Sequence, residues 1–393
     1  MSSRTRDLSS KRRALTESVK KALQRTILES LEKHELEFPE LGITVTVTVE
    51  SMSELLGFKS LQQSQACKPL VEFIDILQGV TWGGEGSEKI FWLSEKEVTE
   101  LRLENESLFK GIGGEDVKKW RIEWRGYYIL FPYKATGSSW VRTFEISYKA
   151  KKQIYDALDF TKCVDDYECT IMQGNMPENE KIRSILNHRI ALGLIRYPNV
   201  ATYLAQYYQQ LRSRAFEGKL IEQYNKMWYE YHRPRTPELV SKPKIVSPRL
   251  TKVARFALDT HGYLPRDSVV AFIPKRDSLS KLKEVLGKVL SREVTEEEVL
   301  MYLLAFLNSK YVDQLLSEKI SKKRGGYVII NETLLQSICI PIPVENHRKT
   351  VERLLDLVKN AVAKGGSDEI EKEINSLVQM LQPTGITGPI MNT

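Results

Sequence analysis

The stretch from Met227 to Pro274 constrains the fold most, because aromatic rings, cations and short β-forming runs alternate within it. Between Lys226 and Arg255 there are eight Lys or Arg residues against two Glu, a local charge of +6. The whole chain of 393 residues carries a net charge of +7, so the excess positive charge is concentrated rather than spread. A cationic surface that bears aromatic rings is typical of a nucleic-acid contact face. The same residues also fit a half-buried aromatic cluster that neighbouring cations keep soluble, and residue types alone do not separate the two interpretations.

Length and composition indicate a soluble protein with more than one structural part. A chain of 393 residues exceeds the usual single-domain range, so we expect one large domain with appendages, or two to three domains. No apolar run approaches the roughly 20 residues that cross a bilayer, and the charged N-terminus lacks the apolar region of a secretory signal. Four cysteines, Cys67, Cys163, Cys169 and Cys339, are too few and too scattered for a disulfide framework. We therefore expect a reducing, cytoplasmic setting.

The spacing of apolar residues predicts both helices and strands, which indicates an α+β fold. An apolar stripe over residues 15–31 predicts a basic, amphipathic helix, and strict alternation from Ile43 to Val49 predicts a strand. Strand patterns continue from residue 70 to residue 150 and include Ile90–Leu93 and a hairpin centred on Gly126. Helical spacings separated by polar stretches then occupy residues 150–226, which we interpret as a helical insertion.

The C-terminal third is predicted to be mainly helical. Apolar residues from Glu296 to Leu316 predict the most deeply buried helix of the chain. Two further apolar stripes, over residues 351–362 and 370–381, are joined by Lys364-Gly-Gly-Ser-Asp368. Gly suits the end of one helix and Ser or Asp the start of the next, so these stripes should form an antiparallel helical hairpin.

The sequence contains no arrangement of residues that supports catalysis. Phe109-Lys-Gly-Ile-Gly113 matches a pattern with which methyltransferases hold S-adenosylmethionine, but polar residues precede it where such a site needs a buried strand, so we interpret it as a loop. No Pro-Pro occurs, which excludes the Asn-Pro-Pro-aromatic motif that cradles a flipped base. Glu217-Gly-Lys219 has the spacing of a nuclease pair without the aspartate at a strand end, and no Cys/His cluster has zinc spacing. We predict no catalytic, metal or cofactor-binding residue in this chain.

A set of short segments follows one another in a recognisable order. They are Gln78-Gly-Val-Thr-Trp-Gly-Gly84, Ile90-Phe-Trp-Leu93, the stretch from Leu108 to Trp120, Gly126-Tyr-Tyr-Ile-Leu-Phe131, Lys242-Pro-Lys-Ile-Val246, Arg255-Phe-Ala-Leu-Asp259 with Tyr263 and Asp267-Ser268, Tyr302-Leu-Leu-Ala-Phe-Leu-Asn-Ser-Lys310, Ile338-Cys-Ile-Pro-Ile-Pro343 and the stretch from Glu371 to Val378. Together they resemble the TaqI-like C-terminal specificity domain, the target-recognition domain of many adenine-specific DNA methyltransferases and fused restriction–modification enzymes. The resemblance covers about residues 70–380, interrupted by the helical stretch, and the family's catalytic half is missing.

This resemblance implies a fold, a domain arrangement and a function. We expect a twisted, mostly antiparallel β recognition domain over residues 61–345 with a helical insertion at about 150–226. A basic helix and strand over residues 1–60 would precede it and a helical hairpin over residues 346–393 would follow. The implied function is sequence-specific recognition of double-stranded DNA in a restriction–modification or related phage-defence system. N6-adenine methylation, or cleavage, would be performed by a separate catalytic polypeptide, which would hold the S-adenosylmethionine.

The cations of two segments are the candidate DNA contacts, because Lys and Arg neutralise phosphates and Arg also reads guanine. They are Arg233, Arg235, Lys242, Lys244, Arg249, Lys252 and Arg255 in the first segment and Lys322, Lys323 and Arg324 in the second. Trp228 and Tyr231 are candidate packing or wedge residues at the DNA contact. For Trp228 and Phe256, however, a position in the protein core is favoured. We expect Asp259 to satisfy buried backbone groups or an Arg rather than to touch a base.

Two other hypotheses remain open. This chain could be part of a split adenine-specific methyltransferase or restriction enzyme and contribute to the active site. It could instead be a protein-interaction component that does not bind DNA. In the DNA-recognition hypothesis, the apolar stripes of the terminal hairpin and of the N-terminal helix would dock the catalytic partner, unless they pack on the protein's own body.

Overall fold

The computed structural model describes residues 34–38, 43–47, 67–148, 153–318 and 327–382. The chain divides into two compact units, Met1–Gln65 and Ala66–Thr393. In the first unit, β1 (His34–Phe38) and β2 (Ile43–Val47) pair antiparallel, which confirms the strand predicted from residue 43. The helix predicted over residues 15–31 lies outside the described residues. Everything below concerns the second unit.

A four-stranded antiparallel sheet lies between two hydrophobic cores. Its strands are β4 (Ile74–Gln78), β14 (Lys244–Pro248), β16 (Ala257–Asp259) and β18 (Val269–Pro274), in the order β16-β14-β18-β4. Successive side chains of a strand point to opposite faces. Ile245 and Phe272 accordingly belong to one core, whereas Val246 and Ala271 belong to the other. Strands buried on both faces explain why this stretch is so rich in β-branched and aromatic residues.

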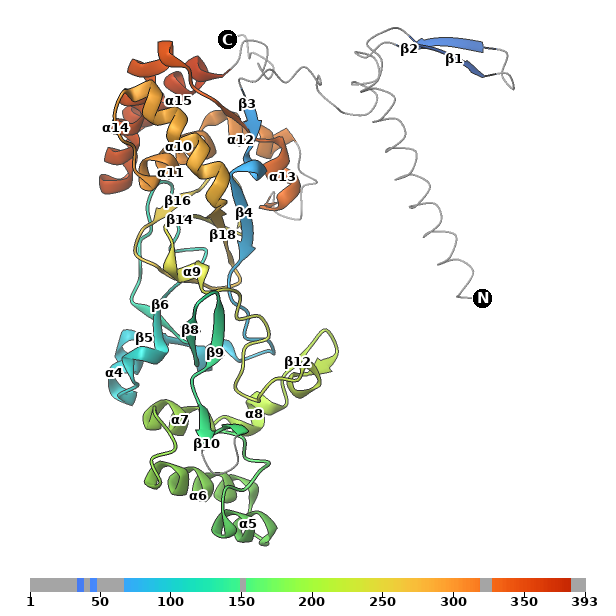
Figure 1. Cartoon of the computed structure of the whole chain (residues 1–393), viewed down its shortest axis with the longest axis vertical. Helices are drawn as coiled ribbons and strands as arrows, with labels where there is room; N and C mark the ends of the chain where they lie inside the picture. The colour runs from blue at the N-terminus through green and yellow to red at the C-terminus, as the bar shows by residue number, and fades with distance from the viewer. Residues whose placement is uncertain (1–33, 39–42, 48–66, 149–152, 319–326, 383–393) are drawn as a thin grey trace. The chain divides into compact units, whose positions relative to one another are not determined.

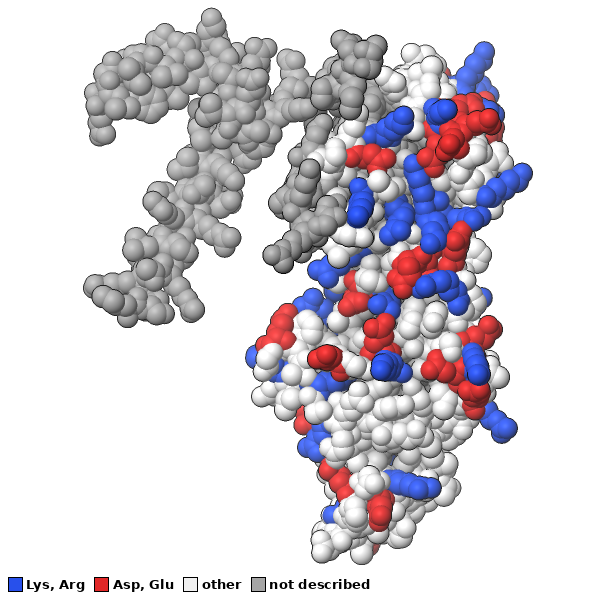
Figure 2. Space-filling model, turned by 180° about the vertical axis from the view of Figure 1, so that it is seen from behind, with Lys and Arg blue, Asp and Glu red and all other residues white. Residues whose placement is uncertain are grey.

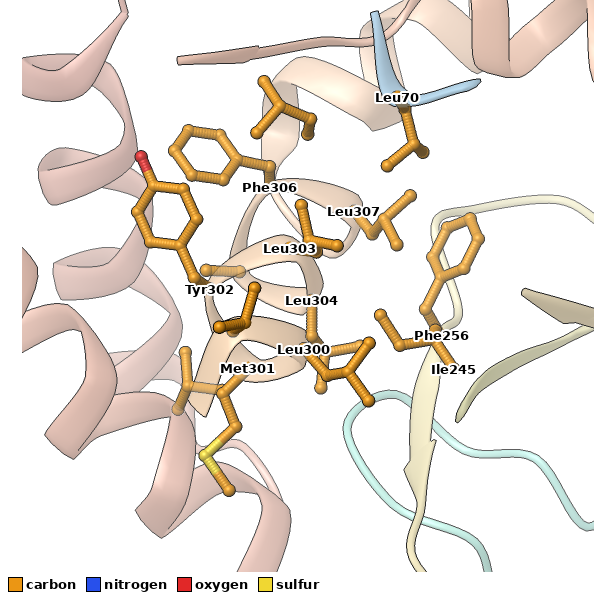
Figure 3. Packing of buried hydrophobic residues seen from close by; sticks show 14 of the residues in the cluster. Leu70, Ile245, Phe256, Leu300, Met301, Tyr302, Leu303, Leu304, Phe306 and Leu307 are labelled. Carbon is orange, nitrogen blue, oxygen red and sulfur yellow. The ribbon is translucent and has the colours of Figure 1, made fainter. Parts of the chain in front are cut away.

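Helices cover one face of this sheet and form the first core. They are α10 (Arg276–Leu290), α11 (Glu296–Leu307), α12 (Lys310–Glu318), α14 (Arg348–Lys364) and α15 (Asp368–Leu381). Every residue of α11 from Val299 to Leu307 is buried, as expected of a helix that is apolar all round. Figure 3 shows Leu300 and Leu304 of α11 directed toward Ile245 and Phe256 of the sheet side.

The single helix predicted from Glu296 to Leu316 is wrong, because the structure has two helices there. The chain leaves the helix at Asn308, which is buried. The Asn308 side chain accepts a hydrogen bond from Phe256 N at 3.0 Å and donates one to Phe256 O at 2.8 Å. The Asn308 amide bonds to Phe256 as the backbone of a neighbouring strand would. It thereby joins the end of α11 to the segment before β16.

The C-terminal helical hairpin is confirmed. Ser367 caps α15 by accepting a hydrogen bond from Ile370 N at 3.3 Å. The apolar stripes are buried in the first core, with Val351, Leu354 and Val358 of α14 and Ile374 of α15 among its members. The stripes of this hairpin therefore pack on the protein's own body, and the alternative in which they dock a partner is wrong for them.

A second, smaller sheet belongs to the other core. Its strands are β5 (Trp92–Ser94), β6 (Leu108–Ile112), β7 (Tyr127–Leu130) and β17 (Leu264–Pro265), in the order β17-β6-β7-β5. β17 runs parallel to β6, and the other pairs are antiparallel. The short helices α3 (Glu88–Phe91) and α4 (Glu95–Leu101) flank β5. Two sequence interpretations are corrected here: residues 108–112 are a strand rather than a loop, and residues 120–125 form no strand, so Gly126 does not centre a hairpin.

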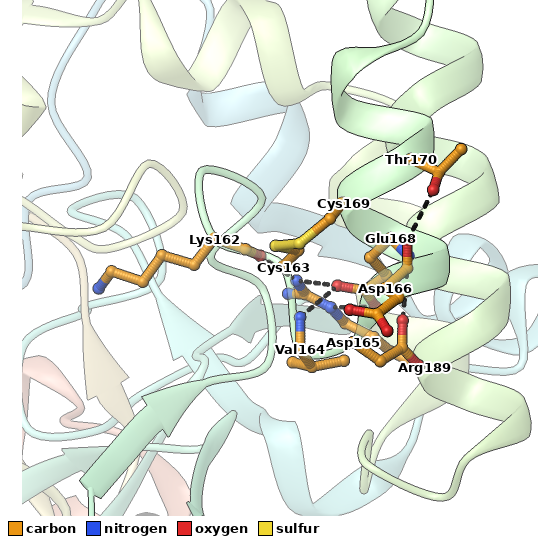
Figure 4. The surroundings of a disulfide bond; sticks show 9 residues. All are labelled: Lys162, Cys163, Val164, Asp165, Asp166, Glu168, Cys169, Thr170 and Arg189. Carbon is orange, nitrogen blue, oxygen red and sulfur yellow. Dashed lines mark hydrogen bonds and ion pairs between the residues drawn. A yellow bond between two sulfur atoms is a disulfide. The ribbon is translucent and has the colours of Figure 1, made fainter.

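The predicted helical insertion is confirmed by α5 (Asp166–Gln173), α6 (Glu178–Ala191), α7 (Pro198–Ala205) and α8 (Tyr208–Arg212). Arg189 holds it together from a fully buried position. Its guanidinium donates to both Glu168 carboxylate oxygens, at 2.9 and 2.8 Å (Figure 4). It also donates to the carbonyls of Ala157, Asp159 and Lys162. A buried guanidinium paired in this way satisfies its donors.

Short strands and helices complete the unit. They are β3 (Cys67–Pro69), β8 (Tyr133–Thr136), β9 (Ser139–Arg142), β10 (Glu145–Tyr148), β11 (Gln153–Asp156), β12 (Ala215–Phe216), β13 (Lys219–Leu220), α9 (Glu238–Ser241), β15 (Leu250–Thr251), β19 (Val328–Ile329), α13 (Glu332–Ser337) and β20 (Cys339–Pro341). Four antiparallel pairs connect these strands: β8 with β9, β10 with β11, β12 with β13, and β15 with β19. β20 pairs with β3, which joins the first strand of the unit to the last strand among the described residues. Within the described ranges, none of the helices has the length and apolar character that a membrane span requires.

The cysteines pair, contrary to the sequence expectation. Cys67 of β3 lies beside Cys339 of β20 with a Cα–Cα distance of 5.9 Å, and Cys163 lies beside Cys169 with 5.2 Å. Both distances suit disulfides, and both pairs are bonded in the structure. The first pair is separated by 272 residues, so the sequence spacing gave no sign of it.

Candidate nucleic-acid interface

The segment that follows β4, residues 78–81, holds several distant segments together through its backbone. Gly79 N donates to Val269 O at 2.9 Å, and Val80 N donates to Pro265 O at 2.8 Å. Thr81 and Arg233 exchange both backbone hydrogen bonds, at 3.0 and 2.9 Å. Family-like motifs that precede the helical insertion in the sequence therefore contact segments that follow it, and they do so at residues 78–81.

Gly79 permits this close approach. A Cβ atom added at Gly79 would lie 2.2 Å from Arg266 O and 2.3 Å from Pro265 O, both of them backbone atoms. No side chain fits there without moving the β17 segment. The glycine of the Gln78-Gly-Val-Thr-Trp motif is thus explained by backbone packing rather than by ligand binding.

Arg235 contacts Gly79, and Arg233 and Arg249 lie within electrostatic range of Arg235. The Arg235 Nε donates to Gly79 O at 3.2 Å. Burial lowers the pKa of the Arg235 guanidinium, and the positive charges of Arg233 and Arg249 lower it further. Arg233 is exposed and pairs with Glu217 at 3.4 Å, and Arg249 is exposed on the chain after β14. Like charges held together at a surface favour an anion in their neighbourhood.

The β15–β19 pair extends this surface with apolar and cationic side chains. Leu250 is 48% exposed and Val253 is 57% exposed. The Lys252 Nζ lies 4.8 Å from the centroid of the Tyr327 ring, and Tyr327 is itself 43% exposed. Ile330 N donates to Arg249 O at 3.0 Å, which connects this pair to the arginine group. Lys322, Lys323 and Arg324 lie outside the described residues.

The other predicted contacts are placed differently. Lys242 is exposed and pairs with Glu238 at 2.8 Å. Arg255 is half-buried, and its Nε has no hydrogen-bond partner among the described residues. Lys244 is fully buried and forms an ion pair with Asp259, which is fully buried as well. Lys244 is therefore not at the surface, and we exclude it from the candidate DNA contacts.

The aromatic residues of the Met227–Pro274 stretch are core. Trp228, Tyr231 and Phe256 are 3%, 0% and 0% exposed, so none of them is available as a wedge. Asp259 Oδ1 accepts from the backbone N–H groups of His261 at 2.9 Å and Gly262 at 3.1 Å. The expectation that Asp259 satisfies buried backbone groups is correct, although its charged partner is Lys244 rather than an arginine.

Arg214 is a positioning residue that sequence reasoning missed. It is 4% exposed and donates to the carbonyls of Leu211, Trp82, Trp228 and Glu230 at 2.5–2.9 Å. Burial lowers its pKa to about 10, because no carboxylate pairs with it directly. It thereby fixes the Trp82–Gly84 turn against the segment that leads to Arg233. Its position just after a polar helix gave no signal of this role.

The described residues contain no group of His, Cys, Asp and Glu that could hold a metal ion. Glu217 and Lys219, the pair with nuclease-like spacing, are both exposed, Glu217 in the turn of the β12–β13 hairpin and Lys219 at the start of β13. On the face of the molecule shown in Figure 2, Lys and Arg are interspersed with Asp and Glu, and the lower end is largely uncharged. This face therefore carries no single continuous positive surface, and a DNA-binding surface on it would be small and local.

No known protein-family model matches this chain. Among solved structures, the type IIG restriction endonuclease BpuSI is similar with a TM-score of 0.36 and 12% sequence identity. The alignment covers 87% of this chain and 35% of the BpuSI chain, so this chain spans about a third of that protein. Similarity at this level identifies neither a shared fold nor a shared function.

Proposed function

We propose that this chain reads the sequence of double-stranded DNA as the specificity part of a restriction–modification or related defence system. In this proposal it directs N6-adenine methylation, or cleavage, by a separate catalytic polypeptide that binds S-adenosylmethionine. The observation that carries the proposal is the grouping of Arg233 and Arg249 within electrostatic range of Arg235, which contacts Gly79 O. All three arginines lie next to a family-like motif in the sequence: Arg233 and Arg235 precede Lys242-Pro-Lys-Ile-Val246, and Arg249 follows it.

The residues divide into two roles in this proposal. Exposed cations with flexible side chains, such as Arg233 and Lys252, would contact phosphates and fix the register of the protein on the duplex. Arg235 and Arg249 would present guanidinium groups to base edges, where Arg pairs with guanine through two hydrogen bonds. Lys242 and Arg255 would add phosphate contacts at the edges.

Selection from a random duplex library tests this proposal. The protein is expected to enrich one short sequence, and Arg235→Ala or Arg249→Ala is expected to change the enriched sequence. Lys281→Glu, on the exposed side of α10, is the matched control and should leave the enriched sequence unchanged. Enrichment of no sequence by the wild-type protein would overturn the proposal.

Cross-linking with labelled S-adenosylmethionine separates this proposal from a split enzyme. A label that appears only on a co-purified catalytic polypeptide supports a specificity part. A label on this chain supports a contribution to the active site instead. Tight binding of a protein partner together with absence of duplex binding would indicate a protein-interaction component.

A further inference from the structure

The two-stranded antiparallel ribbon of β15 and β19 has one buried face and one outer face. Side chains opposite each other in such a pair share a face, and successive side chains of a strand alternate between the faces. Thr251 and its partner Val328 are 2% and 5% exposed, so their face of the ribbon is directed into the protein. Leu250 and its partner Ile329 lie on the other face, and Leu250 is 48% exposed. The ribbon therefore presents a leucine outward.

The outer face also carries a cation and an exposed aromatic ring. Lys252 and Tyr327 are the next residues of this face, because each lies two positions from a member of the Leu250–Ile329 pair. The Lys252 Nζ lies 4.8 Å from the centroid of the Tyr327 ring, whose electron-rich face attracts the ammonium group. Single exposed leucines are ordinary on protein surfaces, whereas a leucine grouped with an exposed tyrosine and a cation is typical of a contact surface.

The charge of this segment favours an anionic partner. Residues 249–253 read Arg-Leu-Thr-Lys-Val and contain two cations and no carboxylate. Arg249 is exposed, and its positive charge lowers the pKa of the Arg235 guanidinium, so the ribbon adjoins the arginine group electrostatically. A surface that combines apolar contact with uncompensated positive charge fits DNA better than it fits an acidic or an uncharged apolar partner alone.

The backbone that presents Leu250 is held on both sides. β15 begins one residue after β14, a middle strand of the four-stranded sheet (Figure 1). Between the two strands, Arg249 N donates to Ser268 O at 2.8 Å. After β15, the Thr251 hydroxyl donates to Val253 O at 2.6 Å. Leu250 thus projects from a fixed backbone, which a side chain that reads a base edge requires.

The dimensions and chemistry of the major groove suit this ribbon. The major groove of B-DNA is about 12 Å wide and admits a two-stranded β-ribbon. Along its floor, the edge of each A·T pair presents the 5-methyl group of thymine, an apolar group that reading side chains contact directly. A leucine side chain has only apolar contact to offer, so thymine is the base whose edge it can recognise.

We propose that Leu250 contacts the 5-methyl group of a thymine in the major groove of bound duplex DNA and thereby selects an A·T pair at that position. The inference rests on the proposed function and adds an apolar reader to the arginine readers. Arg235 and Arg249 would select guanine, whereas Leu250 would select thymine within the same site. Lys252, positioned by the Tyr327 ring, would contact a phosphate at the edge of the groove.

Replacing thymine by uracil in the bound sequence tests this inference. Uracil pairs with adenine as thymine does and lacks only the 5-methyl group. The duplex that the wild-type protein enriches is prepared again with uracil at each thymine position in turn. At one position at least, the wild-type affinity should fall about fourfold, which corresponds to the burial of one methyl group. Leu250→Ala should bind the thymine and uracil forms of that position equally.

Leu192→Ala is the matched control. Leu192 is 50% exposed, close to the exposure of Leu250, and lies at the C-terminal end of α6 in the helical insertion. This variant should keep the difference between thymine and uracil. The inference is overturned, and the proposed function left intact, if every uracil duplex binds wild type as tightly as the thymine duplex, if the difference survives in Leu250→Ala, or if the enriched sequence contains only G·C pairs. Enrichment of no sequence overturns both.

Discussion

At the scale of single residues, the buried Lys244–Asp259 pair shows how a cation in a basic stretch can be structural. The two residues lie opposite each other on neighbouring strands β14 and β16. Both are fully buried, and burial lowers the pKa of the Lys244 ammonium, an effect that Asp259 opposes. Two charges in a low-dielectric interior remain only because each one compensates the other.

Removing one partner of this pair should destabilise the protein strongly. Asp259→Ala is expected to lower the free energy of unfolding by about 3–5 kcal/mol, because it leaves the Lys244 charge buried without compensation. Urea unfolding measures the change. The double substitution Lys244→Met with Asp259→Leu should recover most of the loss.

The matched control for this pair is two residues away. Lys242 forms an exposed pair with Glu238, with both side chains more than two-fifths exposed. Lys242→Ala should change the free energy of unfolding by less than about 1 kcal/mol. Similar losses for Asp259→Ala and Lys242→Ala would contradict the structural role of the buried pair.

His232 should make stability depend on pH. The folded state lowers the pKa of its imidazole, so in the range just below the ordinary value of 6.5 the unfolded state binds more protons. The free energy of unfolding should therefore rise as the pH rises through that range and fall on acidification. Urea unfolding of wild type and His232→Phe at a series of pH values measures this contribution, and an identical pH dependence in both proteins would contradict it.

At the scale of elements, the loop between β6 and β7 connects the two cores. It inserts Trp120 into the first core at 1% exposure and with a φ of +78°. Trp120 N donates to Phe256 O at 2.8 Å, and Trp120 Nε1 donates to Glu371 of α15 at 3.0 Å. A non-glycine residue held in the left-handed region stays there only when its surroundings determine its position.

Truncation of this side chain should loosen the junction. Trp120→Ala is expected to lower the free energy of unfolding by about 3–5 kcal/mol through lost burial and the cavity left behind. Glu371→Gln keeps an acceptor for the indole and removes the pair with Lys119 at 2.7 Å, so a smaller loss is expected. Denaturant unfolding measures both, and a loss below about 1 kcal/mol for Trp120→Ala would contradict the role of the loop.

Regular elements were predictable where one periodicity dominates. The stripes of α10, α14 and α15 follow the helical period, and the short β runs of β14 and β18 are buried on both faces. Prediction failed where a side chain contacts a residue that is far away in the sequence. Residues 120–125 alternate like a strand, but Trp120 packs on the helical hairpin and Trp124 Nε1 donates to Tyr127 O at 2.9 Å. Asn308 ends α11 because its amide binds Phe256, which no local pattern reveals.

The candidate site was predictable only in part. The basic character of residues 226–255 pointed to the region in which the candidate site lies. That Arg235 lies beside Gly79, with Arg233 and Arg249 in its electrostatic range, depends on a side-chain contact across more than 150 residues. Lys244 and Arg249 look alike in the sequence, and only the strand register separates the buried cation from the exposed one.

At the scale of the whole molecule, the Cys67–Cys339 disulfide ties the first strand of the second unit to a strand near its end. The two residues are 272 positions apart, so the bond closes a loop that runs from β3 to β20 and leaves out α14 and α15. In the chain-entropy model the stabilisation by a disulfide grows with the length of this loop. The Cys163–Cys169 bond joins two residues only six positions apart and serves as an internal comparison.

Replacing these cysteines should give unequal losses. Cys67→Ser is expected to lower the free energy of unfolding by about 5 kcal/mol under oxidising conditions, and Cys163→Ser by about 2 kcal/mol. Both differences from wild type should largely vanish after reduction. Denaturant unfolding with and without a thiol reductant measures them, and equal losses for the two variants would contradict the loop-length account.

The central claim, that this chain contacts DNA through its arginine group, is tested most directly by the salt dependence of duplex binding. The logarithm of the binding constant should fall linearly with the logarithm of the salt concentration, by about 0.9 for each phosphate contact. Arg233→Ala should reduce this slope by about one contact for every sequence, whereas Lys281→Glu should leave it unchanged. A wild-type binding constant that does not change with salt would contradict the claim.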